Sequence, residues 1–208
     1  MHRYNAVIIV KDREQVLEAK GKILKAATEI FLTEGLPGLS VRAIANHAGV
    51  STIGIYSHFK GKQGILDALY IEGFERLRNA MNVLGEGGSP REDILLACRN
   101  YLRIGDEYQA HYRLMFGEES RSFKLSNAAQ EAAWKAFALV LDLSKAYLPD
   151  GASKENIEEF SLGVWSVVHG YTGLRHHLVS RIVHFDNWED TIIQAIDSYI
   201  GGYKYEEA

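Results

Sequence analysis

Two short helical segments joined by a tight turn constrain the fold of this chain more than any other feature. The first covers residues 40–48 and reads SVRAIANHA; the second lies within Gly49–Lys62, which reads GVSTIGIYSHFKGK. Gly49 stands between them, where a glycine can take the positive φ of a tight turn. Two short helices joined in this way are typical of a helix-turn-helix, whose second helix can lie in the major groove of DNA. The sequence therefore predicts a DNA-binding head.

The residue types in these two segments suit contacts with DNA. Ser40 and Ser51 precede the two helices, are predicted to cap them, and belong to the predicted DNA-binding surface. Side chains or backbone that can approach base edges lie at the helix starts; they are Arg42, Thr52, Ile53 and Gly54. Side chains that can reach phosphates follow; they are Tyr56, His58, Lys60 and Lys62.

Charge is distributed unevenly along the chain. The formal net charge is −4 over 208 residues, yet residues 1–63 hold nine Lys or Arg against five acids. The remainder holds 14 basic and 22 acidic residues. A basic head on an acidic body is expected when only one end of a protein meets phosphate.

The rest of the chain indicates an all-α fold of about nine helices. Its three prolines lie between helical patterns and not inside them, at Pro37, Pro90 and Pro149. The first long helix is predicted to begin at a capping box of Asp12 and Gln15 and to end near Gly35. A fourth helix is expected from Gly61 to about Leu84, and the later ones are expected from Ser89-Pro90 onward and over 108–117, 127–148, 154–180 and 187–203.

The clearest break between helices is GEGGSP at residues 85–90. We therefore expect a DNA-binding domain over 1–66, a connecting helix to about 84, and a ligand-binding and dimerisation domain over 85–208. No apolar run reaches the ~20 residues of a membrane span. One cysteine, Cys98, allows no internal disulfide, which suits a reducing cytoplasm, so we expect a cytoplasmic protein.

Residues 20–66 closely resemble the DNA-binding domain of TetR-family transcriptional regulators. The matching elements keep their mutual spacing; they are Ile23-Leu24, Ala26-Ala27, Phe31, Gly35, Ser40-Val41, Ile44-Ala45, Ala48-Gly49-Val50-Ser51, Ile55-Tyr56, His58-Phe59, Lys62 and Leu66. The resemblance implies a homodimer that binds a palindromic operator on double-stranded DNA. It also implies that Tyr56, His58 and Lys62 clamp the DNA backbone.

Two alternatives remain for the head. The three helices could be a compact helical core whose Tyr and His lie on an ordinary amphipathic surface, and Lys60 could be a solvated surface residue. Basic residues near the N-terminus could reach the minor groove or form a solvated tail; they are Arg3, Lys11 and Arg13.

The C-terminal half resembles one TetR subgroup with a Trp-His-Gly signature. The matching residues are Trp165, His169-Gly170 and Gly173, and the stretch 112–116 also fits. The resemblance implies that the helices at 154–180 and 187–203 pair with their symmetry mates. The last helix offers a suitable apolar stripe of Trp188, Ile192, Ile196, Tyr199 and Ile200.

Aromatic residues in the body could line a pocket for a small-molecule effector of unknown identity. The candidates are Tyr108, His111, Tyr112, Met115, Phe116, Trp134, Phe137, Leu141, Trp165 and His169. The same spacing also fits plain helical core.

Metal binding and catalysis find little support. Four histidines could suggest a metal site: His169, His176, His177 and His184. His176 and His177 are adjacent, so they point about 100° apart on a helix, and no carboxylate follows either at i+3 or i+4. This spacing makes a poor metal site. Cys98 has no partner typical of a nucleophile, and no phosphate-binding glycine loop follows a strand. We therefore expect no enzyme and no cofactor.

The preferred hypothesis is a ligand-responsive transcriptional regulator, most simply a repressor. An effector would shift the helix over 61–84 and change the separation of the two recognition helices, which must be near ~35 Å to reach successive major grooves. The alternatives are a transcriptional activator, an architectural DNA-binding protein without an effector, and a helical metal-binding protein or enzyme.

Overall fold

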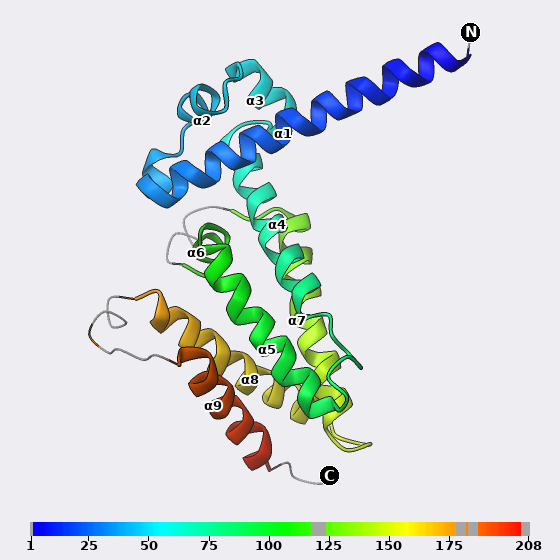
Figure 1. Ribbon diagram of the computed structural model, residues 1–208, viewed down its shortest axis with the longest axis vertical. Helices are drawn as coiled ribbons and strands as arrows, with labels where there is room; N and C mark the ends of the chain where they lie inside the picture. The colour runs from blue at the N-terminus through cyan, green and yellow to red at the C-terminus, as the bar shows by residue number, and fades with distance from the viewer. Residues whose placement is uncertain (1, 118–123, 178–181, 183–186, 205–208) are drawn as a thin grey trace. The chain divides into compact units, whose positions relative to one another are not determined.

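A computed structural model of the chain describes residues 2–117, 124–177, 182 and 187–204, with the backbone alone for 2–13. These residues form helices and connecting turns and no strand, as predicted (Figure 1). The helices are α1 (His2–Gly38), α2 (Val41–Ala48), α3 (Thr52–Phe59), α4 (Lys62–Met81), α5 (Pro90–Glu107), α6 (Gln109–Phe116), α7 (Asn127–Tyr147), α8 (Lys154–Arg175) and α9 (Trp188–Gly202).

Local cap signals place most helix starts where the sequence predicts them. Ser89 caps α5, accepting a hydrogen bond from the amide of Glu92 at 3.3 Å, and Pro90 takes the first helical position. The predicted start of the first helix was wrong, because α1 runs through Asp12 and begins at His2. The break near Gly35 is confirmed: this residue has φ 66° and ψ −162°, outside the helical region.

The backbone forms two compact units. Unit 1 comprises Met1–Gly73 and Gln109–Ala129, and unit 2 comprises Phe74–Tyr108 and Gln130–Ala208. The units therefore cut α4 between Gly73 and Phe74 and group α6 with the helix-turn-helix. The domain limits expected from the sequence, 1–66 and 85–208, stay a prediction.

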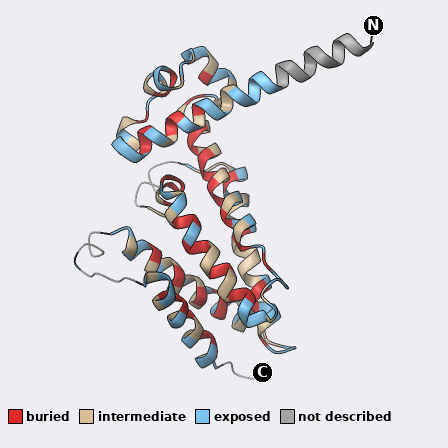
Figure 2. Cartoon of the chain, in the orientation of Figure 1, coloured by how far each residue is buried: buried red, intermediate tan, exposed pale blue. Residues whose placement is uncertain are grey.

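The core of unit 1 lies where α1, α2, α3, α4 and α6 converge. Figure 2 colours buried residues red along the helices. The fully buried side chains of this core include Ile23, Phe31, Ile44, Ile55, Ile65 and Leu114. Burying each of these contributes about 1.5–3 kcal/mol relative to exposure. This core fixes the position of α3 on the head.

The core of unit 2 lies between α5, α7, α8 and α9. Its central side chains are Phe160, Ile192, Ile196 and Ile200, each 1% exposed or less. The ring of Phe160 stacks on that of Tyr147 at 5.3 Å between centroids. Helices α8 and α9 also approach closely, because a Cβ on Gly163 would overlap the hydroxyl group of Tyr199. None of the described helices combines the length and the apolar character of a membrane span.

Candidate nucleic-acid interface

Caps and a left-handed turn hold α2 and α3 in place. Ser40 Oγ accepts from the amide of Ala43, and Ser51 Oγ accepts from the amide of Gly54, both at 3.1 Å. Gly49 ends α2 with φ 65°, as its position in the turn predicts. Both predicted DNA-binding serines therefore act first as N-caps, which orients the helix that follows each of them.

One face of α3 points away from the core. Ile55 is fully buried, whereas Ile53, two residues earlier, is 79% exposed. Residues two apart on a helix point about 200° apart, so these two isoleucines lie on opposite sides. The outward face consists of exposed residues on one side of the helix; they are Thr52, Ile53, Tyr56 and Ser57.

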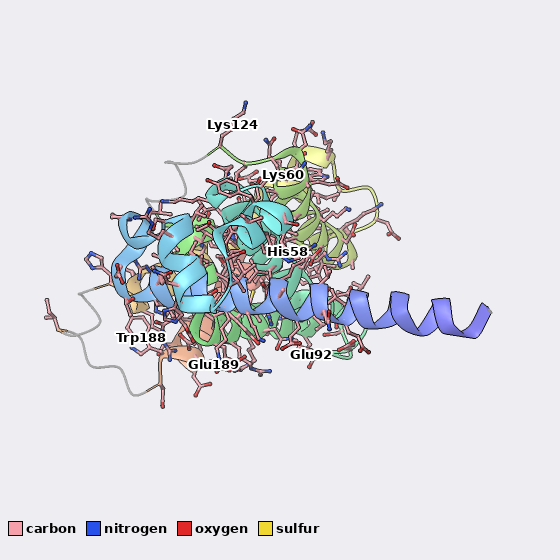
Figure 3. All side chains as sticks on the ribbon, turned by 90° about the horizontal axis from the view of Figure 1, so that it is seen from above. His58, Lys60, Glu92, Lys124, Trp188 and Glu189 are labelled. Atoms are coloured by element: carbon pink, nitrogen blue, oxygen red, sulfur yellow. The ribbon has the colours of Figure 1, made fainter. Side chains whose placement is uncertain are left out.

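The end of α3 turns sharply into α4. Lys60 has φ 58°, the one positive φ at a non-glycine position among the described residues, and Gly61 follows with φ 109°. A Cβ on Gly61 would come within 3.2 Å of Tyr56 Cε1, so the ring of Tyr56 covers this turn. Figure 3 labels His58 and Lys60 at this end of α3; His58 is half-buried and Lys60 is exposed.

Lys62, the fourth residue predicted to contact phosphate, makes a hydrogen bond within the DNA-binding head. Lys62 Nζ donates to the carbonyl oxygen of Leu36 at 2.9 Å. An ammonium group has three donors, so this bond leaves two for a phosphate. Sequence spacing alone did not indicate this bond, since its partners are 26 residues apart.

On α2, Arg42 is exposed at the first turn, where a guanidinium can reach DNA. At the other end of α2, His47 Nε2 lies 2.7 Å from Glu29 Oε2 on α1. This exposed pair links α2 to α1 and was not predicted from the sequence.

The predicted effector residues fall into two groups, one in each compact unit. His111, Tyr112, Met115 and Phe116 lie on α6 in unit 1. The small cavity beside them has a volume of about 10 Å³ and is lined by Thr28, Phe31, Leu69, Ala110, His111 and Leu114. That volume holds about one water molecule, far below the ~300 Å³ of a typical ligand site.

Aromatic side chains in unit 2 form a connected cluster, and a tyrosine that the sequence analysis missed completes it. The ring centroids of Trp134 and Phe137 are 6.2 Å apart, those of Phe137 and Trp165 are 5.5 Å apart, and those of Trp165 and His169 are 5.7 Å apart. The hydroxyl oxygen of Tyr101 lies 2.9 Å from His169 Nδ1. We call these five residues the aromatic cluster.

Burial lowers the pKa of His169 from its ordinary value, which favours the neutral imidazole. In the neutral tautomer that carries its hydrogen on Nε2, Nδ1 can accept a hydrogen bond from the Tyr101 hydroxyl group. Tyr108, another predicted effector residue in unit 2, lies under the guanidinium of Arg76, whose Cζ is 4.5 Å from the ring centroid.

The prediction that the three isoleucines of the last helix contact a partner was wrong. Ile192, Ile196 and Ile200 are buried against the chain's own α5 and α8, with at most 1% exposed. Helical periodicity shows that α9 has an apolar face and cannot show which helix covers it. Other faces of α8 and α9 are therefore the ones open to a partner.

Among the described residues, no group of three or more His, Cys, Asp and Glu side chains is placed to hold a metal ion. His176 Nε2 lies 3.7 Å from Asp106 Oδ1, and Arg175 binds the other oxygen of that carboxylate at 2.9 Å. His184 lies outside the described residues.

Two family models match the chain. The model described as bacterial regulatory proteins of the tetR family matches residues 23–69, and the one described as a tetracyclin repressor-like C-terminal domain matches residues 94–185. The first match covers α2, α3 and the start of α4, which carry the proposed DNA contacts.

Curated relatives carry related descriptions. The HTH-type transcriptional repressor DrrR1 of Streptomyces coeruleorubidus is 30% identical over 119 residues, covering 57% of this chain and 42% of that protein. YvkB of Bacillus subtilis (strain 168), described as an uncharacterized HTH-type transcriptional regulator, is 25% identical over 164 residues, covering 78% and 85%. The alignments with three curated relatives, DrrR1 among them, span less than half the length of those proteins.

A solved structure of a Rhodococcus sp. RHA1 protein of unknown function superposes with a TM-score of 0.74 at 22% identity, covering 88% of this chain and 94% of that one. Identity at this level shows the shared fold alone.

The capped α2–α3 pair, with its turn at Gly49, and the two matched family models agree on one conclusion. This chain belongs to the TetR family, whose members are helix-turn-helix transcriptional regulators and not enzymes.

Proposed function

We propose that the protein is a homodimeric repressor that binds a palindromic operator and is released by a small-molecule effector. The outward face of α3 carries this proposal, since it combines exposed side chains with a buried anchor at Ile55. The description of DrrR1 as a repressor supports repression over activation. Such a protein would act in the cytoplasm, where a bacterial chromosome lies.

The proposed DNA contacts divide into two kinds. Thr52, Ile53 and Arg42 would meet bases, and all three are exposed on the head. Tyr56, His58 and Lys62 would position the backbone; Tyr56 is 58% exposed, and Lys62 keeps donors beyond its bond to Leu36. Ser40 and Ser51 would contribute chiefly by orienting the two helices.

The aromatic cluster is the proposed effector site. It joins large apolar faces to one polar pair, Tyr101 and His169, as small-molecule sites do. Trp134 is 60% exposed, so an effector could reach the aromatic cluster from solvent at this residue. An effector releases DNA only through its different affinity for the bound and released arrangements of the dimer.

The exposed side of α8 is the proposed dimer contact. Leu162 and Leu174 are 54% and 49% exposed, and with the exposed Ser166 and Gly170 they form a row of residues spaced four apart along the helix. No atom lies within 4 Å of a Cβ placed on Gly170, so a second helix can approach there. A dimer would bury this stripe and bring two copies of α3 together on one operator.

Binding to DNA that flanks its own gene, measured with the full-length protein by gel shift, tests the function. Retardation should weaken steeply as salt rises, because phosphate contacts release counterions. No retardation at low salt would reject the DNA-binding function. A loss of retardation on adding planar aromatic compounds, together with a change in tryptophan fluorescence, would identify the effector site.

Light scattering tests the dimer separately. Leu162→Glu and Leu174→Glu should shift the protein toward monomer, whereas Leu84→Glu, at a residue 52% exposed outside the helices, should not. A wild-type protein that is monomeric at micromolar concentration would reject the dimer.

A further inference from the structure

We propose that Ile53 recognises the 5-methyl group of thymine in the major groove. The bases that α3 reads in each half-site would then be recognised by thymine methyl groups and not by paired hydrogen bonds to guanine or adenine. This inference rests on the proposed function, because it requires α3 to enter the major groove of a specific operator.

The position of Ile53 is the first observation. It is 79% exposed and lies opposite the fully buried Ile55, at the centre of the outward face of α3. A single exposed apolar side chain is ordinary on a protein surface. This one, however, stands at the second position of the helix that would approach the base edges, where only the thymine methyl is apolar.

The composition of α3 is the second observation. The helix reads TIGIYSHF and contains no Arg, Lys, Asn, Gln, Asp or Glu. Paired hydrogen bonds to guanine need Arg or Lys, and those to adenine need Asn or Gln. The outward face instead offers hydroxyl groups and one aliphatic side chain. Thr52, beside Ile53, adds a methyl and a hydroxyl group that suit the same base.

Gly54 is the third observation. A glycine inside a helix is less stable than alanine by about 0.5–1 kcal/mol, so its presence calls for a reason. Packing within the head supplies none, because a Cβ there would meet only Ser51 Oγ, at an ordinary 3.5 Å. A missing side chain beside Ile53 lets the first turn of α3 lie deep in the groove, where the Ile53 methyl groups can contact a thymine.

Replacing single thymines by deoxyuridine tests the inference, because only the methyl group is lost. The operator is first selected from random duplexes with the full-length protein. Deoxyuridine at the contacted position should weaken binding about fourfold in one half-site and about 15-fold in both, the value of one or two buried methyl groups. Unchanged affinity at every thymine would overturn the inference.

Variants of Ile53 assign the effect to its side chain. Ile53→Ala should bind the thymine and deoxyuridine operators equally, and Ile53→Val should keep part of the difference. Leu84→Ala removes an exposed aliphatic side chain from the other unit and should keep all of it. An Ile53→Ala protein that still distinguishes the two operators would overturn the assignment.

Gly54→Ala separates stability from DNA contact. The thermal midpoint of the protein should rise, because the helix gains alanine and loses no packing, while affinity for the operator falls. A raised midpoint with unchanged affinity would overturn the close approach at Gly54. Failure to select any operator would reject the proposed function, whereas a selected operator without methyl dependence would reject this inference alone.

Discussion

The ammonium group of Lys62, the first residue of α4, is hydrogen-bonded to the carbonyl oxygen of Leu36, just past the break at Gly35 near the end of α1, with 2.9 Å between nitrogen and oxygen. This bond holds the start of α4 against the end of α1. The same residue is a proposed phosphate ligand, so its loss should affect both folding and DNA binding.

Lys62→Ala should weaken binding to all DNA sequences by a similar factor. The slope of log affinity against log salt should fall by about 0.9 per protomer, because one phosphate contact is lost. The free energy of unfolding should fall by about 1 kcal/mol with the bond to Leu36. The control is Lys145→Ala, which removes the same positive charge at an exposed position in unit 2. A loss confined to one operator sequence would show that Lys62 reads bases.

Asp93→Asn should destabilise the protein by about 1.5–3 kcal/mol. The Asp93 carboxylate is 3% exposed and accepts from the amides of Gly85 and Gly87 at 2.7 and 2.6 Å. An amide side chain would place its NH₂ group against one of these N–H donors. Urea unfolding measures the loss. Glu86→Gln changes an exposed acid in the same loop, and an equal loss there would contradict the role of Asp93.

Stability should depend on pH through His169. Burial lowers its pKa in the folded state, so the unfolded chain binds the proton more readily. The stabilisation is complete above the unfolded pKa of about 6.5 and is lost as pH falls toward the folded value. The unfolding free energy of wild type minus that of His169→Gln should therefore rise with pH across this window. A flat difference would contradict the burial of a neutral imidazole.

Tyr101→Phe tests whether the hydroxyl group donates to His169 Nδ1, because removing such a bond to the neutral ring should raise the pKa of His169. The loss of this bond should also cost about 1 kcal/mol of stability. Proton NMR of the imidazole measures the pKa directly. Tyr171→Phe removes a hydroxyl group from α8, the helix that carries His169, and serves as a control. It should leave the pKa of His169 unchanged.

Gly163→Ala should destabilise unit 2 by about 1–3 kcal/mol, because the added Cβ would overlap the Tyr199 hydroxyl group. Tyr199→Phe in the same protein should recover part of the loss, since the nearest overlapping atom is gone. Gly21→Ala, where a Cβ meets no atom within 4 Å, should stabilise the protein slightly. Thermal unfolding compares the three variants, and equal effects at Gly163 and Gly21 would refute the close packing of α8 and α9.

Local chemistry made the helix-turn-helix predictable from the sequence. Ser40, Ser51 and Ser89 cap helices by accepting hydrogen bonds from the amides three residues later. Gly49 takes the left-handed conformation directly after the last residue of α2. Such signals lie within a few residues of one another, so a single sequence reveals them. The start of α1 was missed because the capping box at Asp12 is equally compatible with a helix interior.

Long-range partners escaped prediction. Tyr101 meets His169 across 68 residues, and no spacing rule connects them. The isoleucine stripe of α9 was assigned to a partner subunit, although it packs on α5 and α8 of its own chain. Periodicity gives the direction of an apolar face, and only tertiary structure gives its neighbour.

The grouping of α6 with the head bears on domain exchange. Within unit 1, Arg113 lies over the ring of Phe31, with Cζ 5.2 Å from the centroid, and Met115 Sδ would be 2.8 Å from a Cβ on Gly73. A chimera that joins this head to another regulator's body after residue 73 would remove the helix that covers both α1 and α4. A head transplanted with residues 109–129 would keep its own packing, so exchange of DNA specificity between relatives requires two segments of chain and not one.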